Sequence, residues 1–150
     1  DLFRGRKVDI KAVQAQMRER MAAEGLPYGE RSMTYNSRLA QEVGKWAETQ
    51  PGGEGIHDAF FRAYFVETRN IGAEDVLVEV AERCGLPGDQ ARAVVRTRSF
   101  KDAVDADWAR SHQYGITGVP TFVSGGYGVV GAQPYEALEQ LVRQVRAEGK

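Results

Sequence analysis

The chain has 150 residues, of which 42% are hydrophobic and 27% charged, enough to build the core of one globular domain or of part of one. The 20 basic and 21 acidic residues leave a net charge of −1, which argues against a nucleic-acid-binding protein. No stretch approaches the roughly 18 apolar residues of a transmembrane helix. The single cysteine, Cys84, excludes an internal disulfide, and the two histidines disfavour a structural zinc site.

The spacing of apolar residues predicts a mostly helical chain up to about residue 114. In six segments these residues recur every three or four positions, and glycine or proline follows most segments as a stop signal. The expected helices begin after Asp9, after Asn36, near Ile56, before Val76, around Ala91 and at Ser99. The third is expected to run unbroken to Thr68, and the short fifth is centred on residues 91–95. The sixth covers about 99–114, from the capping box Ser99–Asp102 to Gly115.

The pattern changes from helix to strand after Gly115. Val119–Val123 is rich in β-branched and aromatic residues, Gly125-Gly126 suits a tight hairpin turn, and Tyr127–Val130 forms the returning strand. A final helix is expected from Pro134 onward. Two strands do not make a stable sheet by themselves, and no other segment is typical of a neighbouring strand. Either one predicted helix is wrong, or the partner strand lies outside this polypeptide.

A glycine motif at the second strand needs a separate interpretation. Residues 126–131 match the G-x-G-x-x-G pattern of dinucleotide-binding loops. That function requires the glycines between a strand and a helix, whereas Val129-Val130 is typical of a strand. We therefore interpret the glycines as part of a hairpin.

Cys84 and the two histidines are weak candidates for catalysis. Cys84 lies on the apolar face of a helix near its C-terminal end, which favours a buried core residue. The partial negative charge of a helix C-terminus is expected to raise the pKa of this thiol. A lone cysteine also cannot run a dithiol–disulfide cycle within the chain. Neither His57 nor His112 has a serine, cysteine or aspartate at a diagnostic spacing, so surface positions are favoured.

The most informative segment is Gly115–Val123, in which Pro120 directly precedes an apolar strand. Proline cannot donate a ladder hydrogen bond, so it must stand at the beginning of the strand. A cis peptide bond there would expose neighbouring backbone groups to a ligand strand. The spacing alone leaves an ordinary loop equally open.

Gly115–Val123, together with Gly131–Pro134, closely resembles the C-terminal part of DsbA-like thioredoxin-fold proteins. Three upstream segments resemble the helical insertion of the FrnE-type branch of that family: Tyr35–Ala40, Phe60–Phe65 and Asn70–Gly72. The resemblance implies an α/β chain with an incomplete thioredoxin fold and a large all-helical insertion, mostly α with one C-terminal β-hairpin. The implied domains are residues 1–114, mainly the insertion, and residues 115–150, the C-terminal part of the thioredoxin domain.

The resemblance also implies the activity of a thiol–disulfide oxidoreductase acting on a protein or on a small thiol or disulfide. In the family, the loop that maps onto Gly118, Val119, Pro120 and Thr121 contacts the substrate, and the Val119–Pro120 bond is expected to be cis. The family's C-x-x-C motif has no counterpart here, so no catalytic residue is assigned and the chain alone is expected to be inactive. No metal or cofactor is expected, and a cytoplasmic location suits the single cysteine.

The first β-α-β unit of the family is expected to be missing. The sequence begins at Asp1 without an initiating methionine, which suggests a processed or trimmed product. Loss of that unit would also explain why Thr121–Val123 has no neighbouring strand.

Two alternatives stay open. The parent could be a kappa-class transferase or isomerase, which uses glutathione and carries serine where oxidoreductases carry cysteine. The chain could instead be a non-catalytic helical binding module that docks a partner through the hairpin edge or an aromatic helix face. The second alternative predicts a homodimer or strand exchange through Thr121–Val123, because a bare interior edge promotes association.

Overall fold

The computed structural model describes residues 10–149, so Asp9, the predicted cap of the first helix, lies outside the described residues. The described helices are α1 Ile10–Ala23, α2 Arg38–Ala47, α3 Ile56–Phe61, α4 Glu74–Arg83, α5 Gly88–Thr97, α6 Lys101–Gln113 and α7 Tyr135–Ala147. A 3-10 turn, Gly53–Gly55, precedes α3, and the strands are β1 Thr121–Ser124 and β2 Tyr127–Val130. The predicted fold class, mostly helical with one C-terminal hairpin, is confirmed.

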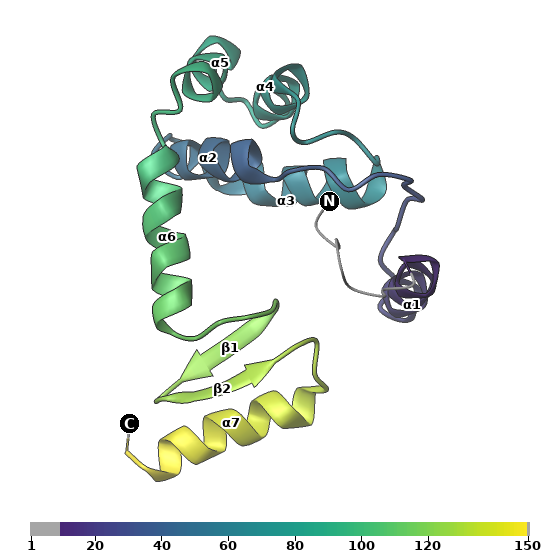
Figure 1. Ribbon diagram of the computed structural model, residues 1–150, viewed down its shortest axis with the longest axis vertical. Coiled ribbons are helices and arrows are strands. Elements are labelled where there is room, and N and C mark those ends of the chain that lie inside the picture. The colour runs from purple at the N-terminus through teal and green to yellow at the C-terminus, as the bar shows by residue number, and fades with distance from the viewer. Residues whose placement is uncertain (1–9, 150) are drawn as a thin grey trace. The chain divides into compact units, whose positions relative to one another are not determined.

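The chain divides into two compact units, residues 1–104 and 105–150, and the division falls within α6. In the first unit, α4 and α5 pack side by side against α2 and α3 (Figure 1). Their shared core is aliphatic and aromatic, and its fully buried side chains include Val43, Ile56, Leu77 and Val80. These residues recur at helical spacing, which is why the sequence pattern located the helices.

The third predicted helix differs from the structure in its last turn. Instead of continuing as α-helix to Thr68, the chain forms a π-helical turn over Arg62–Val66, in which the Glu67 N–H donates to the Arg62 carbonyl at 2.9 Å. The Phe65 carbonyl accepts a hydrogen bond from the Gly29 N–H at 2.8 Å. Thr68 then ends the segment with a positive φ of 56°. A contact distant in sequence thus accompanies the change of helix type.

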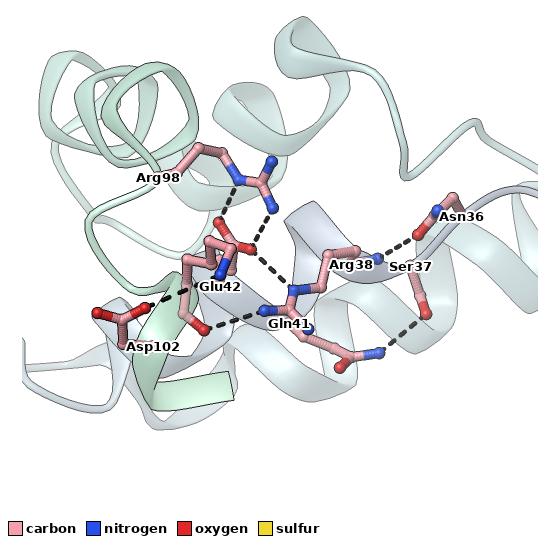
Figure 2. A network of polar contacts seen from close by, with 8 residues as sticks. Asn36, Ser37, Arg38, Gln41, Glu42, Arg98 and Asp102 are labelled. Atoms are coloured by element: carbon pink, nitrogen blue, oxygen red, sulfur yellow. Dashed lines mark hydrogen bonds and ion pairs between the residues drawn. The ribbon is translucent and has the colours of Figure 1, made fainter. Parts of the chain in front are cut away.

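A buried carboxylate joins α2 to the end of α5 (Figure 2). The Glu42 side chain is fully buried and accepts hydrogen bonds from Arg98 Nε at 2.7 Å and Arg98 Nη2 at 2.6 Å. Arg38 Nε donates to the same carboxylate at 2.9 Å, and Arg38 Nη2 donates to the Lys101 carbonyl at 3.0 Å. The Arg98 hydrogen bonds are the main reason that the pKa of Glu42 lies below its ordinary value, although burial opposes them. The network ties α2 to the first residue of α6.

The second unit contains the hairpin and α7. The strands pair antiparallel, with Thr121 opposite Val130 and Ser124 opposite Tyr127. Gly125 and Gly126 have φ values of 56° and 87°, as a type I′ turn requires. Helix α7 packs against both strands and buries Leu141 and Val145 (Figure 1). No helix within residues 10–149 combines the length and apolarity needed to cross a bilayer.

Candidate functional site

The predicted substrate loop, Gly118–Thr121, leads directly into β1. The Val119–Pro120 peptide bond is cis. Thr121 Oγ1 donates to the Gly118 carbonyl at 2.6 Å, and the Gly131 N–H donates to the Pro120 carbonyl at 2.8 Å. These two bonds hold the loop at both ends. Between them, Val119 is 89% exposed.

The main chain of this loop and of β1 offers unpaired hydrogen-bonding groups. Within the described residues, Val119 makes no main-chain hydrogen bond. In an antiparallel pair, residues alternate between those bonded to the partner strand and those whose N–H and C=O point away from it. The turn at 125–126 makes Ser124 a bonded residue, so Thr121 and Val123 have outward-pointing groups. An extended segment lying along this edge would find donors and acceptors in strand spacing.

Cys84 lies in the first unit, at the C-terminal cap of α4, and packs partly buried against the helical core. The pKa of its thiol is raised, first by burial and then by the charge of Asp58. The predicted direction is therefore confirmed, but burial is the main physical cause rather than the helix terminus. A thiol of this kind is a poor nucleophile at neutral pH.

Neither histidine forms a catalytic constellation. His57 Nε2 lies 3.1 Å from Glu48 Oε1 on an exposed surface, and the His112 side chain is exposed near the end of α6. Among the residues that the structure describes, no cluster of three histidine, cysteine, aspartate or glutamate side chains could hold a metal ion.

Two clusters were missed by sequence reasoning. The first is the Glu42 network, whose signal is an acidic residue on the same helix face as Val43 and Trp46. The second surrounds Arg31, whose guanidinium carbon lies 4.3 Å from the centre of the Tyr64 ring. The same carbon lies 5.2 Å from the centre of the Phe65 ring. Arg31 precedes α2 in a segment without secondary structure, where periodicity gives no signal.

Two known proteins are similar to this chain in sequence or in structure. An uncharacterized protein of Bacillus subtilis (strain 168), YwbO, is 33% identical over 107 residues, which cover 69% of this chain and 52% of that protein. The structure of a probable DsbA oxidoreductase from Streptomyces coelicolor superposes with a TM-score of 0.81 and 34% identity, covering 91% of this chain and 60% of that one. The chain thus spans between half and two thirds of these relatives.

A further structure, of 2-hydroxychromene-2-carboxylate isomerase, superposes with a TM-score of 0.80 over 98% of this chain and 72% of that one. Its sequence identity is 17%, so this likeness shows the fold alone. The model of the DSBA-like thioredoxin domain family matches residues 3–143. The chain has a DsbA-like thioredoxin fold and belongs to the DSBA-like thioredoxin domain family.

Proposed function

We propose that this chain is the C-terminal portion of a thiol–disulfide oxidoreductase of the DsbA-like family, and that Gly118, Val119, Pro120 and Thr121 form its substrate-facing loop. The observation that carries the proposal is Val119 at the head of β1, an exposed residue whose main chain makes no hydrogen bond within residues 10–149. An extended peptide or a small disulfide compound could bind there through backbone groups. Neither nucleic acid nor a metal is part of the proposal.

The chemistry itself requires thiols that we assign to polypeptide outside this sequence. A thiolate attacks one sulfur of a substrate disulfide, forms a mixed disulfide and releases the other sulfur as a thiolate. A second enzyme thiol then displaces the reduced substrate and leaves an enzyme disulfide. The chain offers only Cys84, whose pKa is raised. The C-x-x-C motif is therefore proposed to lie before Asp1, and the 150 residues alone are proposed to be inactive.

We further propose that the protein belongs to the FrnE-type branch of the family and is cytoplasmic. Its domains are proposed to be residues 1–114 and residues 115–150. The 34% identity to the Streptomyces protein supports an oxidoreductase over the kappa-class alternative. The isomerase likeness rests on 17% identity. Glutathione would be a cofactor only if the kappa-class alternative were correct. Serine at the first position of the upstream motif would favour it, whereas cysteine would favour the oxidoreductase.

The first test compares the 150-residue chain with the intact gene product in the reduction of insulin disulfides by a dithiol. We expect turnover by the intact product only, and no turnover by the chain with or without Cys84→Ser. Turnover by the chain that survives Cys84→Ser would refute the proposed mechanism.

The second test places an arginine on the loop of the intact product. Val119→Arg should lower kcat/KM for insulin about tenfold or more, because the long side chain covers the backbone groups of the loop. Val142→Arg is the matched control, since Val142 is 44% exposed on α7, outside the loop. Both variants should have the same melting temperature as the wild type. Equal activity of the two variants would contradict the assigned substrate loop.

A further inference from the structure

The segment Gly131–Pro134 joins β2 to α7 and is bonded to the substrate-facing loop. In the register of the hairpin, Gly131 stands opposite Pro120, at a position where the two residues of an antiparallel pair normally exchange both N–H···O bonds. Proline has no N–H, so this pair keeps only the bond from the Gly131 N–H to the Pro120 carbonyl, at 2.8 Å. The attachment of the loop to β2 therefore depends on the direction of one N–H group.

Two features fix the direction of this N–H group. Gly131 has a φ of 89°, a left-handed conformation that glycine adopts without strain. The Gln133 side chain reaches back to the end of β2, where its Nε2 donates to the Val130 carbonyl at 2.9 Å. The Val130 carbonyl and the Gly131 N–H belong to the same planar peptide group, so a hydrogen bond to the carbonyl also restrains the N–H.

We propose that Gln133 is a positioning residue for the substrate-facing loop. Its side chain holds the carbonyl end of the peptide group between residues 130 and 131, and the N–H end of the same group holds the Pro120 carbonyl. In this role Gln133 acts through two hydrogen bonds and does not itself bind the substrate. The inference rests on the proposed function, which assigns Gly118–Thr121 to substrate binding.

The surroundings of Gln133 and Gly131 favour a positioning role over a packing role. Gln133 is exposed, so it adds little to the core between the hairpin and α7. A Cβ on Gly131 would have Gln133 Nε2 as its nearest contact, at an ordinary 3.5 Å. The buried residues of α7 are instead Leu141 and Val145. Substitution of Gln133 is therefore expected to change the loop more than the stability of the fold.

Insulin reduction by the intact gene product tests this role. Gln133→Met keeps the length of the side chain but removes its N–H donor, and it should raise KM about three- to tenfold, as expected for the loss of one hydrogen bond. The value of kcat should stay within about twofold, because a loop that binds substrate and transition state alike affects KM. Gln50→Met is the matched control, since it removes a side-chain amide bond of 2.8 Å to Thr49 Oγ1 in the first unit and should leave KM unchanged.

Two glycine variants test the peptide group itself. Gly131→Ala and Gly126→Ala introduce similar backbone strain, because the φ values of the two glycines are 89° and 87°. At neither position would a Cβ come closer than 3.5 Å to a neighbouring atom. Only Gly131→Ala should raise KM, because Gly126 lies in the turn at the other end of the hairpin. Gly131→Asn should restore much of the loss, since asparagine adopts the left-handed region more readily than alanine.

Hydrogen exchange of the Gly131 amide in the intact product measures the restraint without using activity. Exchange should be about three- to tenfold faster in Gln133→Met than in the wild type, because the peptide group loses one of its two hydrogen bonds. Unchanged exchange would overturn the positioning role.

Two kinetic results would also overturn it. One is a wild-type KM in Gln133→Met under conditions where Val119→Arg lowers kcat/KM. The other is an equal rise of KM in Gly131→Ala and Gly126→Ala. An intact product that reduces no insulin would instead refute the proposed function, and the exchange rates would still decide whether Gln133 holds the peptide group.

Discussion

Replacing Glu42 with glutamine should lower the free energy of unfolding by about 1.5–3 kcal/mol, the range for hydrogen bonds to a charged group. The carboxylate is fully buried and accepts three hydrogen bonds, two from Arg98 and one from Arg38. Removing one partner of a buried ion pair generally costs about 3–5 kcal/mol. Glutamine keeps the shape of the glutamate side chain and one of its acceptor oxygens. The Arg98 side chain is 42% exposed, so its guanidinium can be hydrated when the ion pair is lost. The smaller of the two energy ranges therefore applies.

Urea and thermal denaturation followed by circular dichroism would measure this effect. At about 2–4 °C per kcal/mol for a chain of this size, the melting temperature should fall by roughly 3–12 °C. Glu54→Gln is the control, because Glu54 is an exposed acid in the 3-10 turn, and it should stay within about 0.5 kcal/mol of wild type. Arg98→Gly removes the same ion pair from the other side, while glycine tolerates the φ of 56° at this position.

The pH dependence gives this prediction its sharpest test. The pKa of Glu42 is lowered in the folded state, so its stabilisation is complete above the ordinary carboxyl pKa of about 4.3. That stabilisation is lost as the pH falls through the folded pKa. The difference between wild type and Glu42→Gln should therefore be constant from neutral pH down to about 5 and shrink in more acidic solution. A difference below about 0.5 kcal/mol at neutral pH, or one that grows on acidification, would refute the argument.

The remaining predictions concern a thiol and two glycines. Iodoacetamide should alkylate Cys84 more slowly at neutral pH than it alkylates free cysteine, because the pKa of Cys84 is raised; labelling as fast as free cysteine would contradict this. Gly53→Ala should destabilise the chain by about 1–3 kcal/mol in urea titrations, since a Cβ would lie 1.9 Å from the Ala47 carbonyl oxygen. Gly55→Ala, where a Cβ meets nothing within 4 Å, should instead stabilise by about 0.4–1 kcal/mol, and equal effects of the two changes would count against the packing described.

Periodicity was enough to locate most helices but not to define their ends. The sixth helix was expected from Ser99 and begins at Lys101, where the Lys101 N–H bonds to the Arg98 carbonyl. The fifth was expected to be short, yet α5 covers Gly88–Thr97, because its first turn follows Pro87 and contains a glycine that gives no helix signal. The turn at Gly125-Gly126 was predictable because its chemistry is local.

The candidate site was located by resemblance, whereas its hydrogen bonding could not be predicted. The family pattern pointed to Gly118–Thr121, but which backbone groups are unpaired depends on the register of β1 against β2. Whether a side chain is buried also depends on contacts with residues far away in the sequence. Val13 and Met17 follow helical spacing in α1, yet they are 50% and 41% exposed in the structure. The burial of Glu42 depends on Arg98, which lies on another element.

The π-helical turn at Arg62–Val66 makes one stretch of this chain unusually tolerant of a change in length. A π turn holds about one more residue than an α turn, so deleting a single residue there can restore α-helical geometry without rotating the flanking segments. The same deletion within α2 would rotate every later residue of that helix by about 100°, because an α turn holds 3.6 residues. Glu42 would then leave the side of α2 that meets Arg98. Two deletions of equal size in neighbouring helices therefore differ in consequence, one absorbed within a single turn and the other dismantling a buried ion pair.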